Sequence, residues 1–595
     1  MQRFFYIFMI SILLTSCGNK EQGHFNFPLA FELSGGMRTA TYTETIEFCE
    51  AISRASLLVS YKTYGQSSRG YDLPLLILDK DGLSDPTQIR EHGRMILFVE
   101  ANIHPGEPDG NDAMMLLLKE FEQGQHHKLL ENVSILFAPV VNPDGLVRFG
   151  SYNRINQNGP EKMGWRTNAT NLNLNRDFVK ADAPAMQAWL TLYNHWFPDF
   201  FIDCHTTDGA DYQYAITYML ETFGNMDDAL TEWQLEEYLP YVEAGMFEAG
   251  YPIFPYVSFR SWHDPRSGLI SRPAPPMLST GYTALKNRPG LLIETHMLKP
   301  YKERVLATKK MITLTLERLN ETGQKLVNLV DEADEFVTTS AFRNDSLPVS
   351  YQSTQQHDTV DFLGVEYDVV KSDLTGGDWF QYHNNKPVTF RLPYYRYPQA
   401  SQKVKLPVAY IVPPEWSDVI HRLKLHGIEM IELTAQVELP VETYYFSDVV
   451  WRNAPSEGRM KISTLDIHKR NDTTLFPAGS VLVRTDQPAA RLLAYMMEPA
   501  SNDSFLQWGF FNAIFEQKEY SETYVMEGMA REMLARDPQL REAFELFLEQ
   551  NPEAKQSSWS QLNWFYRRTP YWDAQKNVYP IKRIVQKEVL TAIKQ

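Results

Sequence analysis

Three apolar segments of strand length run into residues whose side chains can bind a metal or transfer a proton. They are residues 95–99, which precede His104, residues 199–204, which precede His205, and residues 290–293, which precede Glu294. Strands that alternate with helices along a chain usually form one largely parallel sheet with helices on both faces. Open sheets of this kind bind ligands beyond the carboxyl ends of their strands. The sequence therefore predicts that these three side chains gather at one edge of an α/β sheet.

The remainder of the N-terminal half continues this alternation of helices and strands. Its expected elements are a helix over residues 45–61, strands over residues 73–78 and 133–141, and a long helix from Tyr301 to about Phe336. A further helix is expected after Pro108, because apolar residues recur there at helical spacing. The predicted fold is an α/β domain over residues 40–338, with a mixed, largely parallel sheet flanked by helices.

A different pattern begins where this unit ends. The chain has 595 residues, too many for one hydrophobic core, and residues 340–350 resemble a linker. Residues 350–450 alternate β-branched and aromatic side chains between Pro and Gly turns, whereas residues 503–550 are largely helical in pattern. Residues 416–433 fit one helix followed by one strand. We therefore predict a C-terminal α+β accessory region over residues 339–595, long enough for two small units.

Charge and cysteine content argue against several functions. The chain carries 57 Lys and Arg against 74 Asp and Glu, which gives a net charge of −17. An acidic chain without a basic cluster is poorly suited to nucleic acid, so we expect no nucleic-acid partner. No Cys-x-x-Cys pair occurs, which argues against a zinc site made of thiolates. Cys49 and Cys204 are expected to be buried thiols.

The N-terminus has the features of an export signal. Arg3 precedes a mostly apolar stretch over residues 4–14, shorter than the roughly 20 residues that span a bilayer. The run Leu14-Thr15-Ser16-Cys17 resembles the lipobox of bacterial lipoproteins, in which the cysteine is lipidated after cleavage. We expect a signal peptide over residues 1–16, a lipid anchor on Cys17 and a tether over residues 17–39. The protein would then be attached to a membrane of the cell envelope and face an extracytoplasmic compartment, periplasmic or surface. The alternative is a plain secretory signal with an incidental cysteine.

His104 and Glu107 lie three residues apart on the turn between a predicted strand and a predicted helix. An imidazole nitrogen and a carboxylate are both ligands that Zn²⁺ accepts, at about 2.0–2.2 Å. Because the chain has 14 histidines and many glutamates, such a spacing is expected by chance, and the pair alone is weak evidence. Its weight comes from the residues that later segments add.

Six short motifs occur in the order and rough spacing of the zinc metallocarboxypeptidase family. They are His104-Pro105-Gly106-Glu107, Asn142-Pro143-Asp144-Gly145, Trp165-Arg166-Thr167-Asn168, Asn173-Leu174-Asn175-Arg176-Asp177-Phe178, Asp203-Cys204-His205 and Leu291-Leu292-Ile293-Glu294. From about residue 70 to residue 330 the chain resembles a carboxypeptidase A-like member of this family. The resemblance implies a zinc carboxypeptidase-like fold and the hydrolysis of C-terminal peptide bonds.

The resemblance also implies a role for each matching residue. His104, Glu107 and His205 would bind one Zn²⁺ per chain, and Glu294 would be the general base for a zinc-activated water. Arg166 would face the developing oxyanion, while Asn175 and Arg176 would hold the free C-terminal carboxylate of a peptide substrate. Tyr282 is the nearest candidate for the tyrosine that closes over the substrate in this family.

Three positions depart from the family pattern. Asn173 stands where many members have an aspartate that orients a zinc histidine, although its side-chain carbonyl can still accept the imidazole N–H. Ala169 stands where some members have the arginine that faces the oxyanion. Arg154 is a rival to Arg166 for this role, and Arg166 is preferred because it lies nearer the Asn175-Arg176 pair. We expect Arg154 to be a solvated surface charge. Tyr282 lies closer to Glu294 than the family spacing suggests, and a packing role is an equal alternative.

Two other functions fit the same motifs. The zinc-water chemistry could cleave a cell-wall peptide or another amide instead of a C-terminal peptide bond. The chain could also be a non-catalytic binding lipoprotein that keeps the fold. The presence of Glu294 and Arg166 argues against the second alternative, because binding alone requires neither residue.

Overall fold

The structure, a computed structural model, describes residues 25–591 and 593. The predicted signal peptide, the lipidation site at Cys17 and the first part of the predicted tether lie outside these residues. Within the described range, none of the helices combines the length and the apolar character needed to cross a membrane.

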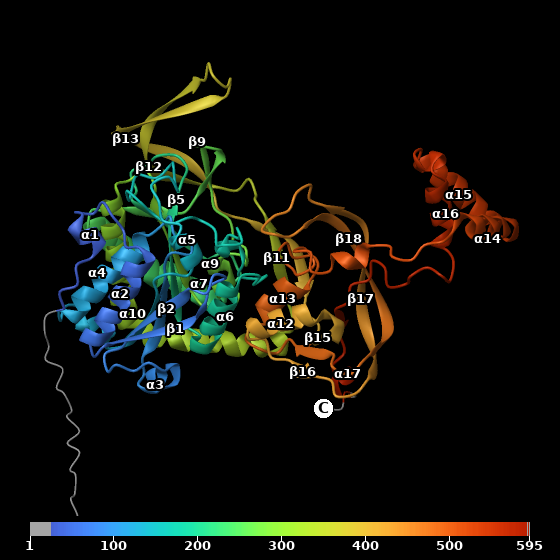
Figure 1. Cartoon of the computed structure of the whole chain (residues 1–595), viewed down its shortest axis with the longest axis horizontal. Coiled ribbons are helices and arrows are strands. Elements are labelled where there is room, and N and C mark those ends of the chain that lie inside the picture. The colour runs from blue at the N-terminus through green and yellow to red at the C-terminus, as the bar shows by residue number, and fades with distance from the viewer. Residues whose placement is uncertain (1–24, 592, 594–595) are drawn as a thin grey trace, which may run out of the picture.

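A mixed eight-stranded sheet lies at the centre of the N-terminal region, residues 25–338 (Figure 1). In spatial order its strands are β1 (Val59–Gln66), β2 (Asp72–Leu78), β4 (Val133–Ala138), β3 (Met95–Glu100), β5 (Phe200–Thr207), β10 (Gly290–His296), β6 (Ile216–Leu220) and β7 (Ile253–Pro255). The four central strands, β4, β3, β5 and β10, are mutually parallel, whereas β1, β2 and β6 are joined antiparallel to their inner neighbours. The predicted class, a mixed α/β sheet flanked by helices, is confirmed.

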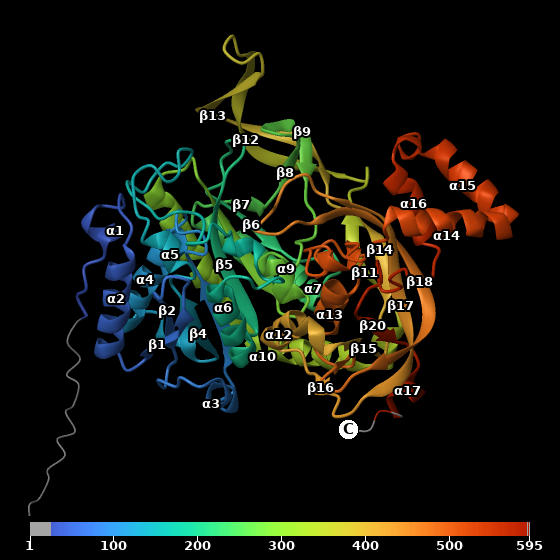
Figure 2. The ribbon, with the colours of Figure 1, turned by 45° about the vertical axis from the view of Figure 1, so that its right-hand side comes forward.

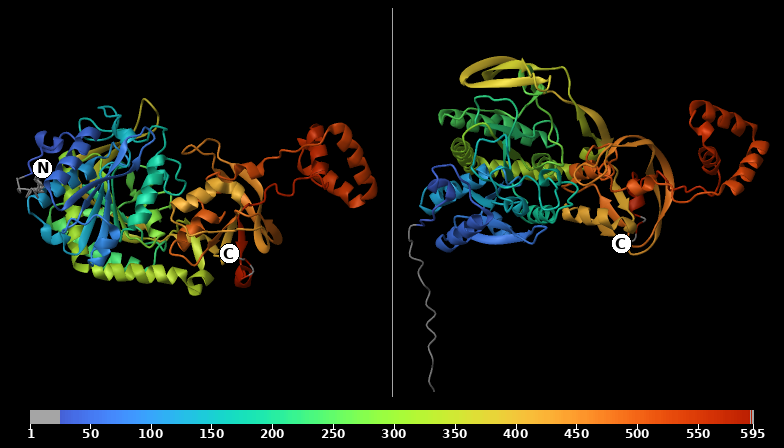
Figure 3. Two further views of the ribbon diagram at one scale, coloured as in Figure 1. Left: turned by 60° about the horizontal axis from the view of Figure 1, so that its bottom comes forward. Right: turned by 45° about the horizontal axis from the view of Figure 1, so that its top comes forward.

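Helices cover both faces of this sheet, which explains why its central strands are apolar throughout. Ile96 and Phe98 of β3 belong to one buried cluster, while Leu97 and Val99 belong to the other. Strands buried on both faces have such continuous apolar runs because alternate side chains enter opposite cores. The principal helices are α2 (Tyr42–Ala55), α4 (Asp109–Glu122), α6 (Pro184–Trp196), α8 (Leu239–Glu248), α9 (Ser279–Ala284) and α10 (Tyr301–Thr338). Figure 3 shows α10 running along one side of the molecule toward the C-terminal region.

Shorter helices occupy the connections of the N-terminal region. They are α1 (Ala30–Leu33), α3 (Pro86–Glu91), α5 (Pro143–Leu146) and α7 (Asp228–Trp233), the 3-10 helices His127–Leu130 and Leu174–Arg176, and the π-helix Gln234–Tyr238. The irregular segment around Leu174–Arg176 matters most for function, because it carries three of the motif residues.

The C-terminal region, residues 339–593, contains a six-stranded sheet with helices packed against it. In spatial order the strands are β16 (Ile431–Glu432), β19 (Val481–Arg484), β15 (Ala409–Val412), β20 (Lys582–Ile584), β17 (Val437–Trp451) and β18 (Ile462–Phe476). The other elements near it are α11 (Ser340–Asn344), α12 (Ser417–Leu425), α13 (Ala490–Met497), α17 (Lys587–Thr591), the 3-10 helices Pro414–Trp416 and Asn512–Phe515, and the strand pair β11 (Ser346–Gln352) and β14 (Gln399–Lys405).

Two parts of the C-terminal region project from the body of the molecule (Figures 1 and 2). The first is a helical unit of α14 (Thr523–Arg536), α15 (Pro538–Gln550), the 3-10 helix Ala554–Gln556 and α16 (Ser558–Tyr566), which has its own small core around Met526 and Phe565. The second is the long hairpin of β12 (Asp358–Lys371) and β13 (Asp378–Tyr395). At its base this hairpin joins β9 (Asp264–Ile270) and β8 (Ser258–Ser261), so that one sheet contains strands from both regions.

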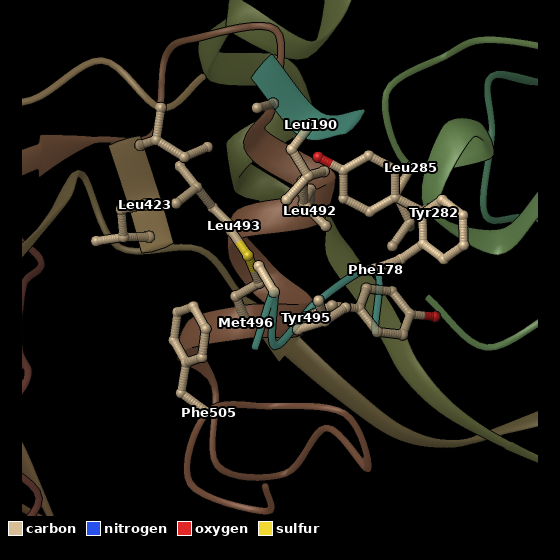
Figure 4. Packing of buried hydrophobic residues seen from close by; sticks show 14 of the residues in the cluster. Phe178, Leu190, Tyr282, Leu285, Leu423, Leu492, Leu493, Tyr495, Met496 and Phe505 are labelled. Carbon is tan, nitrogen blue, oxygen red and sulfur yellow. The ribbon is translucent and has the colours of Figure 1, made fainter. Parts of the chain in front are cut away.

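A continuous hydrophobic core also joins the two regions. Phe178 and Tyr282 of the N-terminal region belong to the same buried cluster as Leu492, Leu493 and Met496 of α13. Figure 4 shows these side chains facing one another. Because burial of apolar area stabilises a fold by about 25 cal/mol per Å², such an interface holds the two regions together as a core does.

Several predicted elements differ from the observed ones. The helix expected over residues 45–61 ends at Ala55, because Val59 and Tyr61 pair with β2 instead. Residues 340–350 are not a linker, since α11 and β11 occupy them. The part of the predicted tether from Phe25 onward packs on the N-terminal region. Residues 505–515 form turns and a 3-10 helix, so the expected helical content begins only with α14.

Candidate active site

The structure brings the three predicted metal ligands together at the carboxyl ends of β3 and β5. His104 and Glu107 lie on the turn between β3 and α4, and His205 lies on β5. One ligand atom from each residue lies within 4.8 Å of the others, and all three side chains are buried. His205 Nδ1 is 3.2 Å from His104 Nδ1 and 2.9 Å from Glu107 Oε2. Among the described residues, this is the one such group of histidine, cysteine and carboxylate side chains.

Outer hydrogen bonds orient both imidazole rings toward this centre. His104 Nε2 lies 2.7 Å from Asn173 Oδ1, and His205 Nε2 lies 2.9 Å from Asp203 Oδ2. Because these nitrogens face oxygen acceptors, they carry hydrogens, and the Nδ1 lone pairs are directed inward. The carbonyl of Asn173 thus makes the contact expected of it, whereas sequence analysis assigned no role to Asp203.

The charges at this centre fit a bound cation. The Nδ1 atoms of His104 and His205 and the Glu107 carboxylate face one another. Their lone pairs and negative charge repel unless a proton or a metal ion lies between them. Burial favours the neutral form of His205, but Asp203 and Glu107 outweigh burial and raise the pKa of His205 well above its usual range. Burial lowers the pKa of His104 to about 4. Two imidazoles, both neutral once a metal ion replaces the proton on His205, and a carboxylate would match the ligand set of a catalytic zinc site with an open position.

Glu294 lies beside the predicted metal ligands, on the strand next to that of His205. In the parallel register of β5 and β10 it is the partner of His205. It lines a pocket of about 550 Å³ together with His104, Glu107 and His205. Burial raises its pKa to about 8, an effect that Glu107 adds to and His205 opposes. A buried carboxyl group beside a candidate metal site is placed to accept and return a proton.

Two arginines contact Glu107 and reach the same pocket. Arg166 Nη1 is 3.1 Å from Glu107 Oε1, and the Arg166 side chain is 43% exposed. Arg154 Nη1 is 2.5 Å from the same oxygen, and its side chain is only 13% exposed. The expectation that Arg154 is a solvated surface charge is therefore wrong. Gly106 allows this approach, because a Cβ at this position would lie 2.4 Å from Arg154 Cδ.

Asn175 and Arg176 line the pocket from the 3-10 helix Leu174–Arg176. Asn175 Nδ2 lies 3.0 Å from His205 Nε2, and the Arg176 guanidinium donates to Asn175 O at 2.5 Å. Burial lowers the pKa of Arg176, and Arg166 adds to this effect. Arg166 and Arg176 bring two guanidinium groups to one pocket, which suits the binding of a carboxylate.

Tyr282 does not reach this pocket. It is fully buried on α9, and its hydroxyl lies 3.0 Å from His426 Nδ1. Its ring packs against Phe178 and Tyr193, so the packing interpretation holds for this residue. Tyr256, between β7 and β8, lines the pocket instead. Burial and the nearby Glu294 raise the pKa of Tyr256 to about 12, so it stays protonated at neutral pH.

Apolar side chains also line the pocket. They include Met219, Leu278 and Leu292. A second cavity of about 580 Å³ adjoins it and shares Met219, Tyr256 and Leu278 as lining residues. The far side of this second cavity is built by the C-terminal region, including Tyr351 and Asn502. The C-terminal region thus borders the cavities around the site.

Comparison with known proteins finds a family model and several relatives that match this chain. The model of the family described as zinc carboxypeptidase matches residues 45–198. Carboxypeptidase 2 of Trichophyton equinum is 25% identical over 502 residues, covering 80% of this chain and 85% of the relative. Carboxypeptidase 2 of Trichophyton rubrum is 24% identical over 500 residues, with the same two coverages of 80% and 85%.

Two solved structures are also similar to part of the chain. The metallo-carboxypeptidase from Pseudomonas aeruginosa has 19% sequence identity and a TM-score of 0.35, covering 48% of this chain and 70% of that chain. The metallo-carboxypeptidase from Burkholderia cenocepacia has 17% identity and a TM-score of 0.34, covering 47% of this chain and 70% of that chain.

The chain therefore contains a zinc carboxypeptidase domain, and the resemblance drawn from its motifs is confirmed. The family match covers the His104–Glu107 turn and the loop with Asn175 and Arg176 but ends before His205. The structure supplies the remaining link, because β5 places His205 against that turn.

Proposed function

We propose that this protein is a zinc metallocarboxypeptidase that removes the C-terminal residue from peptides. The observation that carries this proposal is the convergence of His104, Glu107 and His205, with Glu294 beside them on the next strand. These residues would hold one Zn²⁺ ion. When bound, zinc would polarise the scissile carbonyl and lower the pKa of a water molecule to about 7.

The protein's own groups would position the substrate and move the proton. Arg176 and Asn175 would hold the terminal carboxylate, since a guanidinium group pairs with a carboxylate through two hydrogen bonds. Glu294 would accept the proton of the attacking water and return it to the leaving amine. The Glu294 carboxylate must be ionised for this role, and a cation held by the three ligands would favour that form. The carboxylate-binding pair is what would make the enzyme an exopeptidase.

Arg166 and Arg154 are the proposed stabilisers of the oxyanion. Both guanidinium groups contact Glu107 Oε1 and thus lie beside the position of the metal. Arg166 is the residue that the motif indicates, and the buried Arg154 is a second donor in the same place. Tyr256 is the proposed pocket tyrosine, in place of Tyr282.

The test compares two peptides that differ only in a free or an amidated C-terminus. We expect the zinc-loaded protein to release the last residue of the free peptide and to leave the amidated peptide intact. Glu294→Gln should abolish turnover and keep zinc bound. Equal cleavage of both peptides would reject the exopeptidase and favour a general amidase, including one that acts on cell-wall peptides. Bound zinc without hydrolysis of any peptide would favour a binding lipoprotein.

The N-terminal signal supports a location for this activity. We propose that Cys17 carries the lipid and tethers the protein to the cell envelope, on its extracytoplasmic side. The proposal is supported by the run Leu14-Thr15-Ser16-Cys17 after an apolar stretch. Mass spectrometry of the membrane-associated protein should find acyl chains on an N-terminal Cys17. Release of the protein in soluble form with Cys17 unmodified would reject the anchor.

A further inference from the structure

The segment over residues 171–183 carries Asn173, Asn175 and Arg176 but has little regular structure of its own. Only Leu174–Arg176 is helical, as a single 3-10 turn. Within the segment, Asp177 accepts hydrogen bonds from Lys180 and from the backbone N–H of Ala183. An irregular loop keeps one conformation only where contacts with its surroundings offset the conformational entropy that its backbone loses on ordering.

The C-terminal region supplies several of the fixing contacts. Arg459 donates two hydrogen bonds to the Asp182 carboxylate, at 2.7 and 2.6 Å. Arg422 donates to the same carboxylate at 3.2 Å and to Lys180 O at 3.1 Å. His426 Nε2 lies 2.8 Å from Val179 O. Val179, Lys180 and Asp182, in the second half of the loop, thus form hydrogen bonds with residues at least 240 places later in the sequence.

In the first half of the loop, the contact from the C-terminal region is made by Glu457, while Asn168 of the N-terminal region accepts the backbone N–H of Leu172 at 2.8 Å. Glu457 Oε2 accepts the backbone N–H of Asn173 at 3.0 Å. Among the residues described, no other acceptor pairs with that N–H. Asn173 is the residue whose side-chain oxygen contacts His104 Nε2. A carboxylate of the C-terminal region is therefore two hydrogen bonds away from a proposed metal ligand.

The conformation of the chain around Glu457 is built for this approach. Glu457 and Gly458 are the central residues of a tight turn between β17 and β18, closed by Ser456 and Arg459 through reciprocal backbone hydrogen bonds. Their φ angles are 50° and 75°, as a two-residue hairpin turn requires. A Cβ on Gly458 would lie 3.2 Å from Leu172 Cδ2, so glycine allows the turn to sit directly on the loop. Figure 2 shows the connection between β17 and β18 extending toward the N-terminal region.

We propose that the C-terminal region completes the active site, with Glu457 as a positioning residue for Asn173 and through it for His104. This inference rests on the proposed function, because it assigns the region a role in metal binding and turnover at the same site. The Glu457 carboxylate holds the Asn173 backbone, which fixes the side-chain amide that orients the imidazole. Partners of this kind typically change metal affinity by about 10–100-fold when they are removed.

The test compares two substitutions in the full-length protein, Glu457→Ala and Glu457→Gln. Both keep a Cβ at the positive φ, so the backbone strain is the same in each. Glutamine retains an oxygen that can accept the Asn173 N–H, whereas alanine does not. Glu545→Ala, on the exposed α15, is the matched control. Zinc affinity is measured by competition with a chelator, and kcat and KM are measured with a free peptide.

We expect Glu457→Ala to lower zinc affinity and kcat/KM each by about tenfold, and Glu457→Gln to restore both to within about threefold of the original protein. The control should change neither. An alanine variant with unchanged zinc affinity would overturn the proposal, and so would a glutamine variant as impaired as alanine. If the original protein binds zinc but hydrolyses no peptide, the proposed function fails, and the comparison of zinc affinities still decides this proposal.

Discussion

Asn173 Oδ1 lies 2.7 Å from His104 Nε2, so an uncharged amide orients an imidazole that belongs to the proposed metal centre. The other imidazole, His205, has a carboxylate in the equivalent place, Asp203 Oδ2 at 2.9 Å. The two histidines are therefore supported unequally. A carboxylate makes its imidazole a stronger ligand than an amide does, and the His104 side is the weaker half of the centre.

This asymmetry predicts the effect of two substitutions at Asn173. Asn173→Ala should lower zinc affinity by about 10–100-fold, because His104 loses its outer hydrogen bond. Asn173→Asp should bind zinc at least as tightly as the original protein, since it keeps the acceptor and adds charge. Chelator competition measures both. Equal affinities for all three proteins would show that the Asn173 contact does not support the metal.

The two arginines beside Glu107 should both contribute to turnover. Removing one donor to a developing oxyanion typically lowers kcat by about 10²–10³-fold. We expect losses of this order for Arg166→Met and for Arg154→Met, measured with a free peptide under saturating zinc. Arg148→Met is the control, because Arg148 is exposed and stacks on Trp165 outside the pocket. A fully active Arg154→Met would return the oxyanion role to Arg166 alone.

Substitution of Tyr282 should lower the stability of the protein, whereas substitution of Tyr256 should lower its activity. Tyr282→Phe removes the hydroxyl that contacts buried His426 and should lower the free energy of unfolding by about 1–3 kcal/mol. Its kcat/KM should stay near that of the original protein. Tyr256→Phe should show the reverse pattern, with lower kcat/KM and little loss of stability, because Tyr256 lines the pocket. Urea unfolding and peptide kinetics distinguish the two, and a large loss of activity in Tyr282→Phe would contradict the packing role.

A buried carboxyl group away from the site predicts a pH effect on stability. Burial raises the pKa of Asp112 to about 7, although a hydrogen bond from Tyr301 opposes this shift. The unfolded chain has an aspartate pKa of about 3.9, so between pH 4 and pH 7 the folded state binds more protons and this residue's contribution to stability falls as pH rises.

Asp112→Asn removes this titration and keeps an oxygen for Tyr301. Relative to the original protein, the variant should gain stability from pH 4 to pH 7, by at most about 1.4 kcal/mol per pH unit. Urea unfolding of the zinc-free proteins at pH 4.5, 6.0 and 7.5 measures the difference. A difference that does not change with pH would show that Asp112 is ionised throughout.

The parts of the site that follow strands could be predicted from the sequence. His205 and Glu294 continue apolar strands, and parallel strands bring their carboxyl ends to one edge whatever the loops do. Asp203 could have been found by the same reasoning, because it lies two residues before His205 and faces the same side of β5. The amide contact of Asn173 could be predicted from its place in the motif.

The parts that depend on loop conformation or on distant segments could not be predicted. Arg154 reaches Glu107 only because the loop that carries it folds over Gly106. Tyr256 follows a three-residue strand with no distinctive spacing. Glu457 contacts Asn173 across 284 residues of sequence, and no local pattern encodes such a pairing. The hydrophobic core shared by the two regions could not be predicted either, because the apolar residues of each region are equally compatible with a separate core in that region.

Zinc content measured in two matched variants tests the central claim most directly. The claim is that His104, Glu107 and His205 hold a single metal ion. After exposure to zinc and removal of the excess, the original protein and the control His195→Ala, a substitution of an exposed histidine, should each retain one equivalent per chain. His205→Ala should retain none under the same conditions. Zinc retained at one equivalent by His205→Ala, or absent from the original protein, would contradict the account.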